Sequence, residues 1–375
     1  MHGIGHRDHP GRAPARRSRG AHHRHLAPGR STVTAPDTPA PGGLAADSTV
    51  RSSGTGVIAV AGEALVDLVP APVGDYFEIA PGGSPANVAL GLARLGIPAR
   101  LLARIAEDML GKRIRAHLTH NGVQLDHAVA AKEQTSLAMV SLDENGSPDY
   151  DFRINGTADW QWTPAEIAGA LDPGAVGPVV ALHSGSLALT MAPGDAVLRD
   201  LMMRASESVT ISYDPNCRPM LMGNATAVLR GVHEMLACAN IVKVSSEDLK
   251  WLLPDLTPEQ VVDDWLSRGP MLVAVTLGSD GVVAGTSAGL RARRPGVAVK
   301  VIDTVGAGDT FSAALLAGLH GHGLLGEDSH ARLEALDYST LDELLHDAVL
   351  AAAIACSRRG ADPPTRGDLR LSRLG

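Results

Sequence analysis

A glycine-rich segment late in the chain carries the clearest chemical signal. Gly306, Ala307 and Gly308 come before Asp309 and an apolar stretch that is typical of a helix, over 308–320. Because glycines let the backbone turn tightly, amide N–H groups and the N-terminus of the following helix could bind a phosphate. Asp309 could cap that helix, or it could act as a general base for an attacking hydroxyl. The segment therefore predicts a phosphate site with a carboxylate beside it.

A second glycine element lies near the start of the ordered pattern. Gly82 and Gly83 precede a predicted helix over 85–96, with Asn87 in its first turn, and Asp67 follows the first predicted strand. Paired glycines allow a ligand to approach the backbone, an amide side chain can both donate and accept, and a carboxylate accepts hydroxyl hydrogens. These residues would suit a polyol, although Asn87 could equally be a helix cap and Asp67 a turn residue.

Two common phosphate-binding designs are absent from the sequence. Lys112 is followed by Arg113, and position 106 is an alanine, so the P-loop pattern does not fit there. The dinucleotide pattern of three spaced glycines is also missing after the first predicted strand. Phosphate would therefore be bound by another design, late in the chain.

Short apolar runs that alternate with helical patterns predict the elements that position these residues. This alternation favours an α/β fold, a three-layer doubly wound and mostly parallel sheet with helices on both faces. A strand-like stretch over 297–302 leads into the glycine segment. The other predicted strands are 57–61, 179–182, 209–212, 241–244 and 272–276, and the helices are 85–96, 194–205, 225–238, 247–253, 258–267 and 308–320.

Two segments interrupt that alternation. Residues 64–80 and 128–162 carry the period-two pattern of antiparallel hairpins, with turn residues near Asn145. They hold much of the chain's small aromatic content. We expect a small β-sheet lid that covers the substrate or forms the surface of a homodimer, or else a peripheral sheet packed on the core.

Charge and composition divide the chain in two. Residues 1–53 contain eight arginines, no lysine and three aspartates, a net charge of +5. Because the whole chain has a net charge of −8, the remaining residues carry −13. With little aliphatic periodicity, residues 1–53 are predicted to be a disordered basic tail. Residues 54–375 are predicted to be the folded domain.

Composition also excludes several classes of function. No run of about 18 apolar residues occurs, which argues against a membrane span. The acidic folded part and the 3% aromatic content argue against a nucleic-acid partner. The three cysteines show no zinc or disulfide pattern, and no apolar signal segment precedes Val57, so we expect a cytoplasmic protein.

Taken together, the two glycine elements resemble the signatures of the PfkB, or ribokinase-like, family of carbohydrate kinases. The resemblance covers about residues 56–366. Residues 62–67 and 156–160 look most like the bacterial fructokinases of that family. The resemblance implies a ribokinase-like fold and phosphoryl transfer from ATP to a hydroxyl of a small sugar.

The resemblance also implies a role for each matching residue. Asp309 would be the general base, with the amides of Gly306, Ala307 and Gly308 stabilising the transferring phosphoryl group. Mg²⁺ would be organised through water by Asp248 or Glu247, where Ser245 and Asp248 replace the family's usual Asn and Glu, and K⁺ could bind near Asp303 by analogy. The sugar would be held by Asp67, Gly82, Gly83, Asn87 and Arg153, and the nucleotide by Asn216, Arg218, Lys243, Thr276, Gly278 and Gly281.

The favoured hypothesis is an ATP-dependent fructose kinase. Kinases for 2-keto-3-deoxygluconate, ribose or a nucleoside stay open as alternatives, since Arg153 could pair with the carboxylate of a sugar acid. A third hypothesis, from another class, is a non-catalytic sugar- or nucleotide-binding regulator on the same fold, which the changes at Ser245 and Asp248 would permit.

Overall fold

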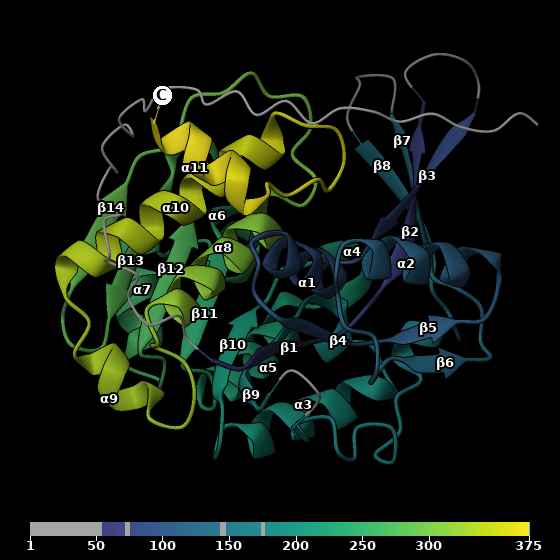
Figure 1. The fold of residues 1–375 in the computed structure, drawn as a ribbon, viewed down its shortest axis with the longest axis horizontal. Coiled ribbons are helices and arrows are strands. Elements are labelled where there is room, and N and C mark those ends of the chain that lie inside the picture. Colours follow the sequence, from purple (N-terminus) through teal and green to yellow (C-terminus); the bar gives the residue numbers. More distant parts are fainter. Residues whose placement is uncertain (1–54, 72–75, 143–147, 174–176, 375) are drawn as a thin grey trace, which may run out of the picture. The chain divides into compact units, whose positions relative to one another are not determined.

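The computed structural model describes residues 55–71, 76–142, 148–173 and 177–374, so the predicted tail over 1–53 lies outside the described residues. An eight-stranded sheet runs through this part in the order β14-β13-β12-β11-β10-β9-β1-β4 (Figure 1). Neighbouring strands from β4 to β12 are parallel, and β13 and β14 are antiparallel additions at one edge. The strands are β1 Val57–Ala61, β4 Ala99–Leu102, β9 Val179–Gly185, β10 Thr210–Asp214, β11 Ile241–Ser245, β12 Leu272–Thr276, β13 Val282–Thr286 and β14 Arg291–Arg294. The prediction of a mostly parallel, doubly wound sheet is confirmed.

Helices cover both faces of this sheet. Alternate residues of β1 point to opposite sides, with Ile58 and Val60 in one apolar core and Ala59 and Ala61 in the other. The first core is covered by α1 Ser84–Arg94, α2 Met109–His120, α8 Ala307–Gly321, α9 Ser329–Glu334, α10 Tyr338–Cys356 and α11 Arg366–Leu374. The second is covered by α3 Gly194–Ala205, α4 Pro219–Met222, α5 Ala225–Leu236, α6 Ser246–Leu252 and α7 Pro258–Leu266. No helix in the described ranges is long and apolar enough to cross a membrane.

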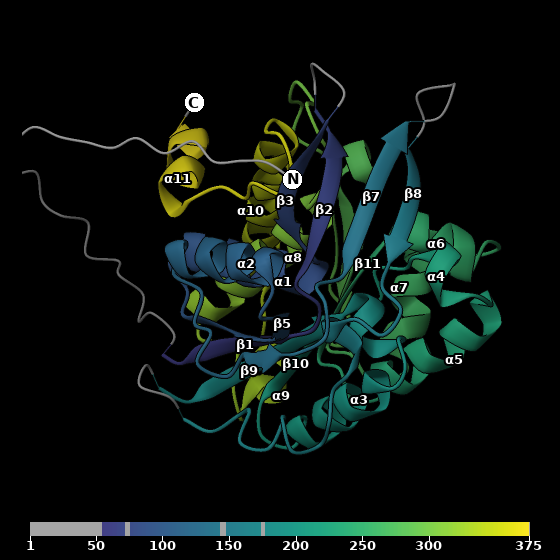
Figure 2. The same ribbon diagram turned by 90° about the vertical axis from the view of Figure 1, so that its right-hand side faces the viewer.

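A separate four-stranded sheet, in the order β3-β2-β7-β8, corresponds to the predicted lid and is called the lid below. In Figure 2 its strands extend away from the main sheet. The strand pairs β2–β3 and β7–β8 are antiparallel as predicted, whereas β2 and β7 pair in parallel. The turn predicted near Asn145 lies outside the described residues. The strands are β2 Leu65–Pro70, β3 Phe77–Gly82, β7 Leu137–Leu142 and β8 Pro148–Arg153.

The lid is narrower than the predicted segments 64–80 and 128–162. Residues 129–131 form β6, Val129–Ala131, which pairs with β5, Arg104–Ala106, in a sheet of its own. Residues 158–160 form a short 3₁₀ helix, η1 Ala158–Trp160. Only the middle of the second predicted segment therefore belongs to the lid.

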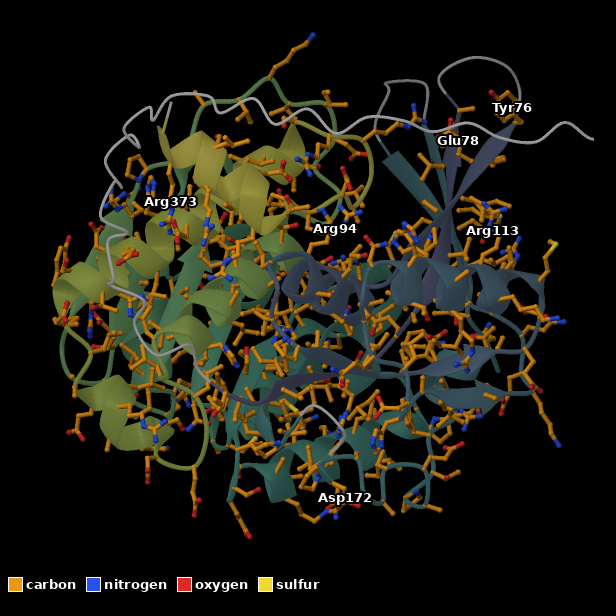
Figure 3. The ribbon with its side chains drawn as sticks, viewed as in Figure 1. Tyr76, Glu78, Arg94, Arg113, Asp172 and Arg373 are labelled. Carbon is orange, nitrogen blue, oxygen red and sulfur yellow. The ribbon has the colours of Figure 1, made fainter. Side chains whose placement is uncertain are left out.

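The loop after α10 contacts the lid. Arg359 lies 3.0 Å from Glu78 on β3, and its Nη2 donates to the carbonyl oxygen of Pro70 at 3.2 Å. Figure 3 shows Glu78 and the neighbouring Tyr76 on this sheet. Tyr76 and Phe77 are more than half exposed, so the lid carries apolar surface.

The prediction of a strand over 297–302 is wrong. The edge strand β14 ends at Arg294, and the chain then continues without strand pairing to the glycine segment. Val301 and Ile302 are each 60% exposed, and the amides of Ile302 and Asp303 donate to the carbonyl oxygen of Cys356 at the end of α10. The alternating apolar pattern was misleading because no sheet edge is paired with it.

Helices α1 and α8 pack closely because Gly91 has no side chain. A Cβ added to Gly91 would lie 2.7 Å from the Cβ of Ala313 on α8. This distance is shorter than real carbon contacts allow, so any side chain at Gly91 would push the two helices apart. Both candidate glycine elements lie at the N-termini of these two helices.

We predict that Gly91→Ala lowers the free energy of unfolding, although alanine favours a helix by about 1 kcal/mol over glycine. Overpacking against Ala313 costs about 1–3 kcal/mol, which outweighs that gain. The matched control is Gly231→Ala in the middle of α5, where an added Cβ meets no described atom within 4 Å. Denaturant unfolding should show the control at or above the wild-type stability. A stabilised Gly91→Ala variant would contradict the close packing of α1 and α8.

Candidate active site

Asp309 is the point where the two glycine elements meet. Its carboxylate accepts a hydrogen bond from the Asn87 amide at 2.9 Å and another from the Ser84 hydroxyl at 2.7 Å. Asn87 and Asp309 are 222 residues apart in the sequence and both are buried. The structure therefore places the predicted base in direct contact with the predicted sugar-binding amide.

The glycine segment before Asp309 forms the N-terminus of α8. Gly306 has a φ of 74°, in the left-handed region, and a Cβ there would lie 2.8 Å from the Cβ of Ala361. Glycine is therefore required for both conformation and space. Asp303 holds the segment in place, since its carboxylate accepts from the amides of Val305 and Gly360. The first turn of α8, beginning at Ala307, leaves N–H groups that can bind an anion.

A buried ammonium group lies under this segment. Lys243 Nζ is 2.9 Å from Asp214 Oδ2, and the two side chains are 6% and 3% exposed. A Cβ added to Gly308 would lie 2.8 Å from this nitrogen, so Lys243 contacts the glycine segment from below. Burial by itself would lower the pKa of Lys243, but Asp214, Asp248 and Asp309 raise it above its ordinary value. The predicted nucleotide-binding lysine is therefore a buried positive charge beside the predicted anion site.

Asp67 lies on the lid strand β2 and faces the end of β3. A Cβ at Gly82 would lie only 2.0 Å from Asp67 Oδ2, and one at Gly83 would lie 2.6 Å from the carbonyl oxygen of Glu63. The two glycines thus make room for the carboxylate and for the turn into α1. Burial raises the pKa of Asp67 to about 6, the charge of Arg218 opposes this, and Asp309 adds to it. Arg218 and Asp309 are therefore close enough to act on Asp67.

The segment after β10 brings Asn216 and Arg218 to the same end of the sheet. Asn216 has a φ of 39°, which is uncommon for a residue with a side chain and occurs at functional sites. Its amide nitrogen lies 3.3 Å from the hydroxyl of Ser186. Arg218 is exposed, and its Nη1 donates to Asn216 Oδ1 at 2.9 Å. Arg218 was predicted to contact phosphates, and its charge also acts on Asp67, a predicted sugar-binding residue.

The predicted metal residues differ in their surroundings. Asp248 is buried, and its carboxylate accepts from the Cys217 amide at 2.8 Å and from the Ser245 hydroxyl at 2.8 Å. It forms a capping box with Ser245 at the start of α6, whereas Glu247 is exposed. Within the described ranges, no three His, Cys, Asp or Glu side chains are grouped so that they could hold a metal ion by themselves.

The predicted nucleotide loop follows β12. Thr276 pairs with Ser245 across neighbouring parallel strands, so this loop lies beside the start of α6. Gly278 and Gly281 have φ values of 60° and 95°. A Cβ at Gly281 would lie 2.0 Å from the carbonyl oxygen of Arg294, so the loop is packed closely against the chain after β14.

Arg153 is the one predicted sugar-binding residue that the strand register separates from the others. One row of paired residues across β2, β7 and β8 consists of Val66, Leu137 and Arg153. Asp67 pairs with Ala138 and so belongs to the next row. Because successive side chains point to opposite faces of a sheet, Arg153 and Asp67 lie on opposite faces. Arg153 is exposed and forms an ion pair with Asp151.

Two buried carboxyl groups were not singled out from the sequence as site residues. Glu63 follows β1 and is 2% exposed, its Oε2 has no hydrogen-bond partner within the described part of the chain, and burial raises its pKa to about 7. Asp159 in η1 is equally buried. The available signal was a charged residue in an apolar context, directly after a strand for Glu63 and before Trp160 for Asp159.

Comparisons with known proteins agree with this geometry. The family described as pfkB family carbohydrate kinase matches residues 57–366. A fructokinase from Rhizobium leguminosarum bv. trifolii is 34% identical over 281 residues, which cover 74% of this chain and 84% of the relative. This chain also resembles solved structures over most of its length.

A crystal structure of a fructokinase with bound ATP from Xylella fastidiosa is 27% identical, with a TM-score of 0.75, covering 85% of this chain and 99% of the other. Fructokinase from Vibrio cholerae O395, also 27% identical, has been solved with fructose, ADP and calcium at a TM-score of 0.72, covering 84% of this chain and 98% of the other. Its double mutant with fructose, ADP and potassium has a TM-score of 0.73, covering 86% and 99%. This chain therefore belongs to the pfkB family of carbohydrate kinases and is an ATP-dependent phosphotransferase that acts on an alcohol group of a sugar.

Proposed function

We propose that the sugar is fructose and that Asp309 is the general base. The observation that carries the proposal is the hydrogen bond between Asn87 and Asp309. It joins the predicted hydroxyl-binding element to the N-terminus of α8, the predicted anion site, at one buried carboxylate. The choice of fructose is supported by the curated relative named fructokinase and by the solved fructokinases of the same fold.

In this proposal Asp309 takes the proton from the sugar hydroxyl as its oxygen attacks the γ-phosphorus of ATP. The bond from that phosphorus to the β–γ bridging oxygen breaks, and ADP leaves. Phosphoryl transfer depends on positioning and charge stabilisation more than on covalent chemistry. The amides of Gly306, Ala307 and Gly308 and the positive charge of Lys243 would stabilise the negative charge that develops on the phosphoryl oxygens.

The sugar would be held between the lid and the sheet. Asp67 and Asn87 supply acceptors and a donor for hydroxyl groups, while Gly82 and Gly83 leave space beside Asp67. Arg218 would contribute its charge from the other side. Arg153 is left out of this proposal because it lies on the opposite face of the lid sheet.

The nucleotide would lie on the other side of Asp309, along the carboxyl ends of β10, β11 and β12. Such an edge is the usual ligand site of a parallel sheet. Arg218 and Lys243 would contact phosphates, and Asn216 would orient Arg218. Thr276, Gly278 and Gly281 would line the rest of the nucleotide.

Mg²⁺ fits the residues present if phosphates and water supply most of its ligands. Mg²⁺ in kinases is bound by substrate phosphates, water and one or two carboxylates. Asp248 keeps a carboxylate near the phosphate side, although its oxygens already accept protein hydrogen bonds, so we propose contact through water. The exposed Glu247 is less suitable. Bound Mg²⁺ would neutralise phosphate charge, and K⁺ near Asp303 stays a proposal.

The alternatives are separated by a substrate panel. A higher kcat/KM for 2-keto-3-deoxygluconate, ribose or a nucleoside than for fructose would favour another kinase of the family, and the exposed position of Arg153 makes the sugar acid the weaker candidate. The absence of ATP turnover with every sugar would favour the regulator. A homodimer through the lid, a cytoplasmic location and the boundary of the folded domain near residue 54 also stay predictions.

We predict that Asp309→Asn lowers kcat for fructose phosphorylation by about 10²–10⁴-fold, the usual contribution of a positioned base. Asparagine keeps the size of the side chain and one hydrogen-bond acceptor, so fructose should still bind. A coupled ADP-release assay measures the rate, and thermal unfolding checks the fold. Near-wild-type turnover would refute the role of Asp309.

We predict that kcat/KM for fructose falls as the pH drops through about 6, because Asp67 must be ionised to accept hydroxyl hydrogens. Arg218 favours the ionised form, so Arg218→Gln should raise the pKa of Asp67 and move this acid limb to higher pH. Arg113→Gln, an exposed arginine of α2, is the matched control. If the pH at which kcat/KM falls is unchanged in Arg218→Gln, Asp67 does not control the acid side of the pH profile.

A further inference from the structure

We propose that Asp159 is a positioning residue that fixes how the two hairpins of the lid join, and so where Asp67 meets the sugar. The inference rests on the proposed sugar contact of Asp67 and adds a residue that lies outside the binding site. Asp159 is 2% exposed and belongs to η1, after the last lid strand.

Asp159 accepts hydrogen bonds from the starts of two lid strands. Its Oδ1 accepts from the amide of Ala64, directly before β2, at 2.8 Å. Its Oδ2 accepts from the hydroxyl of Ser136, directly before β7. Thr157 Oγ1 lies 2.6 Å from the same Ser136 hydroxyl and donates to the carbonyl oxygen of Ile154, directly after β8. One carboxylate therefore connects the starts of β2 and β7.

Asp159 lies at the pairing of β2 with β7, whose register is not set by a hairpin. The strands of β2–β3 and of β7–β8 are neighbours in the sequence and pair antiparallel. The pair β2–β7 is parallel, and its strands are far apart in the sequence. A slip of one residue would turn every side chain of β2 to the other face, including Asp67. Some other contact must therefore set this register.

The contacts of Asp159 lead directly to Asp67. Ser136 holds β2 twice, through Asp159 and through its own carbonyl oxygen, which accepts from the amide of Val66 at 3.0 Å. Ala64 and Val66 are thus both fixed, and Asp67 is the next residue. Its position is critical, because Asp67 Oδ2 fills the space that a Cβ at Gly82 would need.

The body of the protein holds η1 in place. Arg104 on β5 is buried, and its Nε donates to the carbonyl oxygen of Ala158 at 3.0 Å, while its other nitrogens pair with Glu133 and Glu166. Arg104 and Glu63 are charged groups that interact with Asp159. Burial raises the pKa of Asp159 to about 6, and the bonds from Ser136 and Ala64 oppose that rise. The ionised form, with two acceptor oxygens, matches two donors.

The test is a double-mutant cycle on fructose KM with Asp159→Asn, Asp67→Asn and the double variant. Asparagine offers one acceptor where two are needed, so Asp159→Asn should raise fructose KM by about tenfold, with ATP KM and kcat changed less than about threefold. Because Asp159 acts through Asp67, the double variant should be no worse than Asp67→Asn. Ser136→Ala removes one donor and should raise fructose KM in the same direction, which covers the case in which Asp159→Asn does not fold.

Thr257→Ala, which removes the cap of α7 on the body of the protein, is the control for general destabilisation, and it should lower Tm without changing fructose KM. If Asp67→Asn leaves fructose KM unchanged, the proposed sugar contact fails. If Asp67→Asn raises it but Asp159→Asn and Ser136→Ala do not, the positioning role fails. Additive effects in the double variant would also overturn the inference, since Asp159 would then act independently of Asp67.

Discussion

The hydrogen bond from Asn87 to Asp309 is the interaction on which the rest of the site depends. It joins the first turns of α1 and α8, two helices that can approach because Gly91 leaves room for Ala313. Every other part of the site is arranged around this contact: the glycine segment before Asp309, the lid strand with Asp67 beside α1, and the buried Lys243 under Gly308. The close packing of two helices thus brings the proposed sugar-binding element and the proposed phosphate-binding element to one carboxylate.

Charge imposes the second constraint, because an acidic chain must bind an anionic nucleotide. The net charge of −8 opposes ATP, so attraction must come from local groups. Lys243 is the buried group proposed for this role, and Asp214 at 2.9 Å, together with Asp248 and Asp309, favours its charged form. Removing either partner of such a buried pair costs about 3–5 kcal/mol, since it leaves an unpaired charge. The pair therefore couples the stability of the sheet to the electrostatics of the site.

The elements that could be predicted from the sequence are those with strong local signals. The six predicted helices and five of the predicted strands are present, because apolar periodicity reports burial directly. The strand over 297–302 failed because pairing depends on a neighbouring edge that the local pattern cannot show. The position of Arg153 on the opposite face of the lid sheet from Asp67 could not be predicted, because it depends on the register of β8 against β7. The burial of Asp159 and Glu63 depends on segments distant in sequence that meet in the interior, which a local charged residue in an apolar context only suggests.

The most direct test of the central claim is a crystal structure of this chain with fructose and a non-hydrolysable ATP analogue. The account predicts that the phosphoryl-accepting hydroxyl lies about 2.6–3.2 Å from an Asp309 carboxylate oxygen, the distance of a functional general base. It also predicts the terminal phosphate at the amides of Gly306, Ala307 and Gly308. A sugar bound away from Asp309, or a phosphate away from the start of α8, would contradict it.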